Sequence, residues 1–411
     1  MSVAPEIALP QTVAGGSAPE LVEPRFARRP LASNGYKTLY TFKAGGDGTF
    51  PLANLIALDG TFFGTTSIGG ASNEGTIFKV NASGQEAVVY SFKGLHKDGS
   101  YPEYGLIAAK NVLYGTTPSG GSGQCSYTSS YGSQLVGCGI VFKVTTSGHE
   151  DVLYNFEAGS DGAEPVESLV ALNGTLYGIT VSGGTGNCSG VSGFSGCGAV
   201  FSVSTSGTER VLYSFKGGAD GAFPSGLIAL NGVFYGTTAS GGGSGCYQYG
   251  CGTVFKMSTS GKEDVLYRFK GRPDGSSPNG NLVVLGGSFY GSTYDGGAKN
   301  RGSVFKASMT GQERLLYSFK GGNDGANPAS GLTDVNGMLY GTTQFGAGSG
   351  CYHGFGCGSI FKITTSGTET VLHSFASGEP LAGLTSFDGT LYGTTQAGGP
   401  LGRGSVFHIS P

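Results

Sequence analysis

The strongest constraint on the fold is a five-residue stretch, Leu339-Tyr340-Gly341-Thr342-Thr343, at the centre of a unit that the chain repeats seven times. Six copies carry Tyr before the glycine, and the first carries Phe63. The other copies centre on Gly64, Gly115, Gly178, Gly236, Gly291 and Gly393, so that successive glycines are 51, 63, 58, 55, 50 and 52 residues apart. A period of about fifty residues predicts a repeat architecture rather than independent domains.

Each unit begins with the pattern of a β-hairpin. In residues 225–270, two β-type runs, Leu227–Leu230 and Val233–Thr238, are separated by Asn231-Gly232. This dipeptide is a strong hairpin signal because a type I′ turn needs positive φ at both central residues. Asn-Gly, Asp-Gly or Gly-Gly stands at this point in five other units, and Lys110-Asn111 is the poorest match.

Two further strands complete the unit. A Gly-rich loop leads to a third strand at Gly252–Met257, and a Ser-Gly turn leads to a fourth at Glu263–Phe269. No segment has a 3.6-residue apolar period long enough for a helix. A four-stranded sheet cannot bury both faces alone, but seven such sheets packed face to face in a ring can. The sequence therefore predicts an all-β, seven-bladed β-propeller with four antiparallel strands per blade.

The two ends of the repeat predict how the ring closes. The last unit supplies three strands, Leu384–Phe387, Leu391–Thr395 and Ser405–Ile409, and the chain ends at Pro411. The first recognisable piece, Tyr36–Lys43, has the pattern of a fourth strand. We expect this N-terminal strand to pair with the last blade and to remove an exposed sheet edge.

The repeated Leu-Tyr-Gly-Thr-Thr, Gly-x-Val-Phe-Lys and Tyr-Ser-Phe-Lys strands resemble the GloVer tandem repeat of bacterial proteins, over nearly all of residues 36–409. The resemblance implies a repeat fold and an envelope or secreted location. It supplies no catalytic residue. Residues 1–33 stand outside the repeat and are expected to form a flexible N-terminal segment, so we expect the propeller to occupy residues 34–411.

Composition excludes two classes of partner. Charged residues make up 12% of the chain, the net charge is −3, and no basic block occurs. A nucleic-acid surface needs clustered Lys and Arg, so no nucleic-acid partner is expected. No apolar run approaches the 18 residues of a membrane-spanning helix, so no membrane span is expected.

The eight cysteines fall in pairs, and each pair lies within one loop between the second and third strands. Positions that flank a hairpin loop lie close in space, as a disulfide requires. The alternative, a zinc site, would need ligands from several blades, and no paired Cys-x-x-Cys or His partner occurs. Disulfides favour an oxidising compartment and hence export, although residues 1–33 contain no clear signal peptide. The expected bridges are Cys125–Cys138, Cys188–Cys197, Cys246–Cys251 and Cys351–Cys357.

Two groups of residues are candidates for ligand binding, and both belong to one face of the disc. Between the paired cysteines lie aromatic residues whose rings can bind sugars or protein surfaces, or can fold back onto their own loop. The residues just before each inner strand line the channel mouth and differ between blades. The candidates are Tyr247, Tyr249, Tyr352 and Phe355 in the loops, and Asn54, Tyr104, Glu167 and Asn281 at the channel mouth.

A repeated Asp-Gly-x-x-Pro motif joins each outer strand to the next blade. Its carboxylates could form a cation-binding ring, but each copy offers a single carboxylate, and Asp-Gly and Pro are typical of a structural turn. Glycoside cleavage usually requires two carboxyl groups at a defined separation. Glu167 has no obvious acidic partner, since Glu164 lies three residues away in the loop.

These observations favour an exported binding or scaffold module that uses the disulfide loop face, for carbohydrate or protein ligands, without a cofactor or metal. We expect a monomer located outside the cell or in the envelope. The alternatives are an extracellular carbohydrate-active enzyme, either a hydrolase or a lyase, and a purely structural envelope protein. Convergence of two carboxylates, or of a His and a carboxylate, in one pocket on that face would favour the enzyme.

Overall fold

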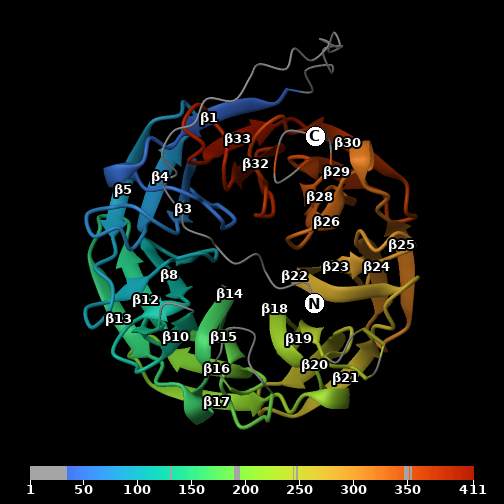
Figure 1. The fold of residues 1–411 in the computed structure, drawn as a ribbon, viewed down its shortest axis with the longest axis horizontal. Coiled ribbons are helices and arrows are strands. Elements are labelled where there is room, and N and C mark those ends of the chain that lie inside the picture. Colours follow the sequence, from blue (N-terminus) through green and yellow to red (C-terminus); the bar gives the residue numbers. More distant parts are fainter. Residues whose placement is uncertain are drawn as a thin grey trace.

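The chain forms a ring of seven sheets around a central axis, as the computed structural model in Figure 1 shows. The structure describes residues 35–129, 132–188, 195–243, 245–246, 249–346, 351 and 354–411. The segment 1–33, expected to be flexible, lies outside these residues, so the boundary at residue 34 stays a prediction. In the described part of the chain, no helix is long and apolar enough to cross a membrane.

The seven-bladed propeller expected from the repeat is confirmed, with antiparallel strands in the order inner to outer in every blade. Blade 1 is formed by β2 (Ile56–Leu58), β3 (Thr61–Thr66), β4 (Thr76–Asn81) and β5 (Glu86–Ser91). Blade 2 is formed by β7 (Ile107–Ala109), β8 (Val112–Thr117), β12 (Ile140–Thr145) and β13 (Glu150–Asn155). Blade 3 is formed by β14 (Ala163–Leu172), β15 (Thr175–Ser182), β16 (Ala199–Ser204) and β17 (Glu209–Ser214).

The next three blades follow the same plan. Blade 4 is formed by β18 (Ala222–Leu230), β19 (Val233–Ser240), β20 (Thr253–Ser258) and β21 (Glu263–Arg268). Blade 5 is formed by β22 (Gly275–Leu285), β23 (Ser288–Gly296), β24 (Ser303–Ser308) and β25 (Glu313–Ser318). In blade 6 the inner strand is split, and the elements are β26 (Ala326–Pro328), β27 (Thr333–Val335), β28 (Met338–Phe345), β29 (Ser359–Ile363) and β30 (Glu369–Ser374).

Smaller elements decorate the blades on the side of the long loops. Blade 2 carries the short pair β6 (Gly99–Ser100) and β9 (Ser119–Gly120) and the loop hairpin β10 (Ser126–Ser129) and β11 (Gly132–Leu135). Single 3-10 turns contain the Asp of the Asp-Gly motif in four blade connections, at Gly45–Asp47, Gly159–Asp161, Gly218–Asp220 and Gly322–Asp324.

The N-terminal strand closes the ring, as predicted. Blade 7 contains β31 (Thr385–Phe387), β32 (Thr390–Thr395) and β33 (Ser405–Ile409), and its outer strand is β1 (Lys37–Thr41). The pairing is antiparallel, with Lys37 opposite His408 and Thr41 opposite Ser405. In Figure 1 the blue β1 lies beside the red β33, so the two ends of the chain meet in one sheet.

The tight turns between the first two strands of each blade have the predicted conformation. Their first central residue has φ between 48° and 57° in all seven blades, including Lys110, whose sequence matches the pattern least well. These turns hold the inner hairpins in register without long loops, so all the long loops lie on the opposite face.

Two phenylalanines pack at every junction between blades. One comes from the third strand of a blade and the other follows the outer strand of the preceding blade, and their ring centroids lie 5.0 to 5.5 Å apart. Phe319 and Phe361 are a typical pair, and both are fully or almost fully buried.

The central glycine of the repeat makes room for this packing. A Cβ atom built on Gly341 would lie 2.6 Å from the tip of the Phe361 ring, and the same clash with the equivalent phenylalanine occurs in every blade. The seven-fold recurrence of glycine at this point is therefore explained by space for an aromatic ring on the neighbouring strand.

Removing the closing strand should destabilise the whole ring. Deletion of residues 1–43 opens blade 7 and removes Phe42, which is fully buried against Phe78. Because loss of a buried Phe alone costs about 3–5 kcal/mol, we expect the melting temperature to fall by roughly 10 °C or more. Deletion of residues 1–32 is the matched control and should leave it unchanged. Equal melting temperatures for the two truncations would contradict the closure.

Candidate functional site

The long loops between second and third strands lie on the same face as the connections between blades. In blade 3, the amide of Gly184 donates to the carbonyl of Gly159 in the preceding connection, and in blade 4 Gly242 donates to Gly218 in the same way. The long loops and the inner-strand starts therefore share one face, as the sequence predicted.

The four predicted disulfides are present, and each closes a single loop. The paired Cα atoms lie 4.9 to 5.0 Å apart, and the partners are separated by 13, 9, 5 and 6 residues in the chain. All eight sulfurs are thereby bonded, so the alternative of a zinc site built from these cysteines is wrong. Among the described residues no other group of three or more His, Cys, Asp and Glu is placed to hold a metal ion.

The second cysteine of a bridge also holds the start of the next inner strand. The carbonyl of Cys138 accepts a hydrogen bond of 3.0 Å from the amide of Glu164. The carbonyls of Cys197 and Cys251 accept equivalent bonds of 2.9 Å from Phe223 and Ser277. In blades 2 to 4, the disulfide therefore fixes both the loop and the adjoining part of the channel mouth.

Two of the four candidate residues at the channel mouth link neighbouring inner strands. The Asn54 side-chain oxygen accepts a hydrogen bond of 2.5 Å from the amide of Gly383, and that of Asn281 accepts one of 2.8 Å from Leu227. These contacts give both asparagines a structural role between blades.

The other two candidates come together at the border of blades 2 and 3, with an acidic partner that the sequence analysis missed. Tyr104 lies within electrostatic reach of Glu103, Glu164 and Glu167, and Glu103 lies within reach of Glu164. Glu103 arrives from the adjacent blade beside Glu164, whereas burial alone acts on Glu167, so the expectation that Glu167 has no acidic partner stays a prediction. The place of Glu103 next to Tyr104 in the aligned repeats could have revealed this acidic residue.

Burial sets the protonation of this acidic group. It raises the pKa of Glu167 to about 7, and it raises the pKa of Glu103 to about 7 with a further contribution from the charge of Glu164. Burial and the three carboxyl groups raise the pKa of Tyr104 well above its usual value. At neutral pH the two glutamates can therefore donate as well as accept hydrogen bonds, while Tyr104 remains neutral.

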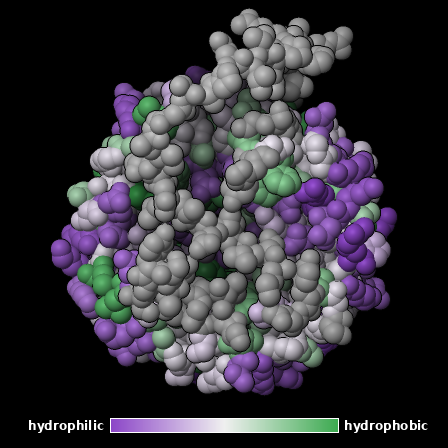
Figure 2. All heavy atoms as spheres, viewed as in Figure 1, coloured by the Kyte–Doolittle hydropathy of each residue, from purple (hydrophilic) through white to green (hydrophobic). Residues whose placement is uncertain are grey.

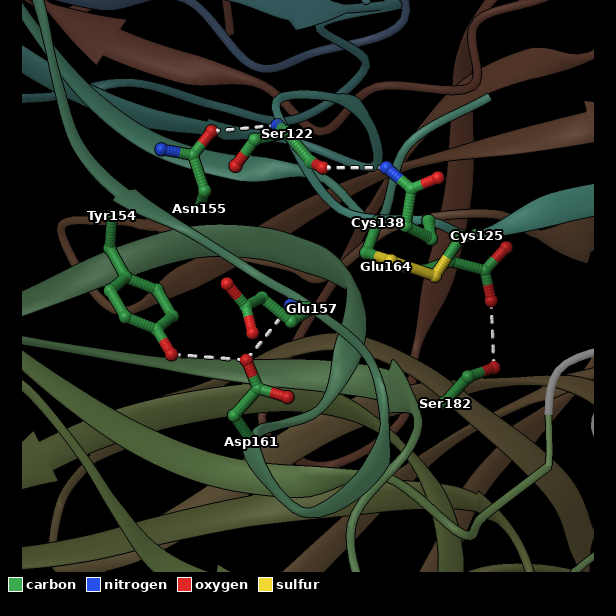
Figure 3. The surroundings of a disulfide bond; sticks show 10 residues. Ser122, Cys125, Cys138, Tyr154, Asn155, Glu157, Asp161, Glu164 and Ser182 are labelled. Atoms are coloured by element: carbon green, nitrogen blue, oxygen red, sulfur yellow. Dashed lines mark hydrogen bonds between the residues drawn. A yellow bond between two sulfur atoms is a disulfide. The ribbon is translucent and has the colours of Figure 1, made fainter. Parts of the chain in front are cut away.

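The site contains carboxyl oxygens that are available to hydrogen-bond a ligand. Glu164 accepts a hydrogen bond of 2.7 Å from the Ser182 hydroxyl (Figure 3). Within the part of the chain that the structure describes, no side chain or amide hydrogen-bonds the carboxyl groups of Glu103 and Glu167. Among the described residues, no lysine or arginine is one of the charges that act on Glu103, Tyr104 or Glu167.

Two of the four loop aromatics are described, and both are exposed. The side chain of Tyr249 is 41% exposed and that of Phe355 is 54% exposed, with the Phe355 ring 6.0 Å from the ring of Phe345. Tyr247 and Tyr352 lie outside the described residues. The structure thus places exposed aromatic rings in the stapled loops of blades 4 and 6.

A family profile, the Gloeobacter/Verrucomicrobia repeat, matches residues 26–128, 123–355 and 245–411. The chain belongs to this repeat family. The resemblance to the GloVer repeat is thereby confirmed across the propeller. No protein among the curated sequences matches the chain.

Several solved structures share the general architecture at low similarity. A gluconolactonase from Xanthomonas campestris is 11% identical, with 93% of this chain and 94% of that chain covered and a TM-score of 0.44. A putative 6-phosphogluconolactonase from Bacteroides uniformis is 15% identical, with coverages of 81% and 88% and a TM-score of 0.46. A GH74 enzyme from Niastella koreensis is 14% identical, with coverages of 85% and 50% and a TM-score of 0.48.

Loss of one loop bridge should have a local and moderate effect. The Cys188→Ser, Cys197→Ser double variant removes a bridge that closes a loop of 9 residues. In the chain-entropy model we expect a loss of about 2 kcal/mol in the free energy of unfolding. Chemical denaturation of this variant and the parent measures the change. Peptide mapping without reduction should find all four local bridges, and a bridge between blades would contradict the assignment.

Proposed function

We propose that this member of the repeat family is an exported binding module whose ligand docks on the disulfide loop face. The four bridges support export, because disulfides persist in oxidising compartments outside the cytoplasm. The module acts as a monomer. In Figure 2 the described residues of the rim are mostly hydrophilic, with small separate hydrophobic patches, whereas a stable interface usually presents a larger apolar one.

The observation that carries the proposal is the combination of ligand-binding groups on this face. The free carboxyl groups of Glu103 and Glu167 lie at the channel mouth, and the exposed rings of Tyr249 and Phe355 lie in stapled loops. The bridges hold the backbone of those loops, which lowers the entropy lost when a ligand orders them.

This combination favours a carbohydrate over a protein as the ligand. Half-protonated carboxyl groups can pair with sugar hydroxyls both as donors and as acceptors, and aromatic faces can pack against the apolar face of a sugar ring. A protein partner would be expected to meet a continuous apolar core with aromatic anchors, for which the exposed aromatic residues of the described surface are too scattered.

Removing the two exposed rings should weaken binding. We expect the Tyr249→Ala, Phe355→Ala double variant to lose about tenfold or more in affinity, since a stacked aromatic contact contributes about 0.5–1.5 kcal/mol beyond its buried area. A glycan array identifies the ligand, and calorimetric titration of parent and variant measures the affinity. The matched control is Lys262→Ala, Gln312→Ala, which changes exposed residues in turns on the opposite face. Loss of binding in the control but not in the aromatic variant would place the ligand site on the opposite face and contradict the proposal.

A second function, hydrolysis of a glycosidic bond, is favoured by one specific observation. Glu103 and Glu164 lie close enough for the charge of one to raise the pKa of the other, and Glu103 has a pKa of about 7. A general acid requires a pKa near the working pH, and a second carboxylate would serve as base or nucleophile. The pair meets these two requirements at the channel mouth, where a polysaccharide bound by the loop aromatics would pass.

The two functions give different results with the same variants. If the chain hydrolyses its ligand, Glu103→Gln should reduce turnover at least 100-fold, while calorimetry with the same polysaccharide shows binding within a few-fold of the parent. Release of reducing ends from a panel of polysaccharides measures turnover. Unchanged turnover in both Glu103→Gln and Glu164→Gln would rule out this pair as the catalytic residues, and binding without cleavage by the parent would leave the binding module as the function.

A further inference from the structure

The outer part of each junction between blades contains a repeated group of three polar residues that the proposed ligand site does not use. A tyrosine of the outer strand donates to the Asp of the following Asp-Gly motif, over 2.5 to 3.0 Å in five junctions. In the sixth, Tyr317 donates to Asp324. In five groups the same hydroxyl also contacts the glutamate that begins the outer strand of the next blade, and in the Tyr154 group the hydroxyl lies within electrostatic reach of that glutamate. The groups are Tyr40-Asp47-Glu86, Tyr90-Asp98-Glu150, Tyr154-Asp161-Glu209, Tyr213-Asp220-Glu263, Tyr267-Asp274-Glu313 and Tyr317-Asp324-Glu369.

The aspartate of each group accepts hydrogen bonds from backbone amides as well as from the tyrosine. Asp98, for example, accepts hydrogen bonds of 2.6 and 2.8 Å from the backbone amides of Lys93 and Gly94, besides the 2.5 Å bond from Tyr90. In the other five groups the aspartate accepts one backbone amide as well as the tyrosine hydroxyl. Each aspartate therefore serves as a hydrogen-bond acceptor for the tyrosine.

Counting protons shows what this means for the glutamate. Tyr90 lies 2.5 Å from Asp98 and 3.2 Å from Glu150, and its hydroxyl has a single proton. That proton lies on the shorter bond, which is the one to Asp98. The contact with Glu150 is then a hydrogen bond only if the glutamate carries a proton and donates it to the tyrosine oxygen. An ionised glutamate would instead place two lone pairs against each other.

The remaining oxygen of the glutamate is consistent with a neutral group. In all six copies, Oε1 is buried and has no hydrogen-bond partner within the described residues. A buried carboxylate oxygen without a partner is costly, whereas the carbonyl oxygen of a neutral carboxylic acid tolerates this position far better. The same unpaired oxygen recurs in six junctions, so it is not an accident of one of them. The residues are Glu86, Glu150, Glu209, Glu263, Glu313 and Glu369.

We propose that these glutamates are protonated in the folded protein and donate a hydrogen bond to the tyrosine of the preceding blade, so that formation of the ring takes up protons. Each of these junctions thereby binds one proton between two blades when the protein folds. The propeller is consequently more stable in a mildly acidic medium than in an alkaline one.

The charges around the glutamates agree with this assignment. Burial is the main cause that raises the pKa of Glu150, Glu209, Glu263, Glu313 and Glu369 to about 7, and it also raises the pKa of Glu86. The aspartate of each junction raises it further, and Asp151 and Asp264 do so for their own neighbours. The tyrosine and the nearest lysine or arginine act in the opposite direction and do not outweigh burial; these bases are Lys43, Lys93, Arg268, Lys270 and Lys320.

The direction of the pH dependence follows from these values. Between the ordinary pKa of 4.5 and the folded value of about 7, the folded chain binds more protons than the unfolded chain. Linkage then requires the free energy of unfolding to fall as the pH rises through this interval. The contribution is fully present below about pH 4.5 and is lost above about pH 7.

The seventh junction follows the same rule with different residues. His373 replaces the tyrosine and Tyr36 stands where the other blades have glutamate, and their rings stack with centroids 3.9 Å apart. Burial lowers the pKa of His373 to about 4, so this pair too is uncharged at neutral pH. A neutral pair at all seven junctions is what a half-buried position between two blades requires.

The test is an infrared titration of the folded protein, because a protonated carboxyl group has a carbonyl stretch that a carboxylate lacks. The parent should show this band at pH 6 and lose it as the pH is raised to 8.5. In the Glu263→Gln, Glu313→Gln, Glu369→Gln triple variant, the change in the band should fall by roughly a third, since three of eight glutamates with a raised pKa no longer titrate, namely the six of the junctions together with Glu103 and Glu167. The matched control is Glu157→Gln, an exposed glutamate, which should leave the band unchanged.

Thermal melting provides a second, independent readout. The melting temperature of the parent should fall between pH 5 and pH 8, and the triple variant should show a clearly smaller fall, because glutamine mimics the protonated acid. A single Glu313→Gln variant serves if the triple variant does not fold. Absence of a titrating carboxylic-acid band in the parent, or an equal band change in parent and glutamine variants, would overturn the proposal.

Discussion

The structure depends on one contact, repeated at every junction, in which a buried phenylalanine of one blade packs on a phenylalanine of the next. The pair Phe319 and Phe361 explains why each repeat has a glycine at its centre. The ring of Phe361 occupies the space where Gly341 lacks a side chain, and this brings the ring to the junction. A larger residue in place of the glycine would displace the phenylalanine ring and would thereby change the spacing between two blades.

Closure of the ring extends this contact to the two ends of the chain. Phe42 follows the N-terminal strand and packs on Phe78, so the last blade meets the first through the same pair of rings as all others. The outer part of the junction between blades 6 and 7 differs, because Tyr36 and His373 form a stack where the other junctions have a tyrosine and a glutamate. The packing of the phenylalanine pair is therefore the same around the ring, with ring centroids 5.0 to 5.5 Å apart, while the polar part of the junction varies.

The functional face is built on the stable part of this scaffold. Cys138 closes its own loop and binds the amide of Glu164, so the loop and the channel mouth form one connected unit. The acidic group of Glu103, Tyr104 and Glu167 lies on that unit, and no base of the described residues acts on it. Burial of acids that the protein itself leaves unpaired is unfavourable for folding, and such positions are frequently functional.

The sequence by itself determined the number of blades, the four strands, the closing strand and the four disulfides, because each is a matter of local pattern. The register of Gly341, the turn at Asn231 and the pairing of cysteines within one loop need only neighbours in the chain. Only the tertiary structure decided that Glu103 meets Glu164 and that Asn54 holds Gly383, since these partners come from different blades. Comparing equivalent positions of the repeats reveals which residues differ between blades. Contacts across a junction, however, depend on how two blades pack. The protonation of a side chain depends in turn on the burial that this packing creates.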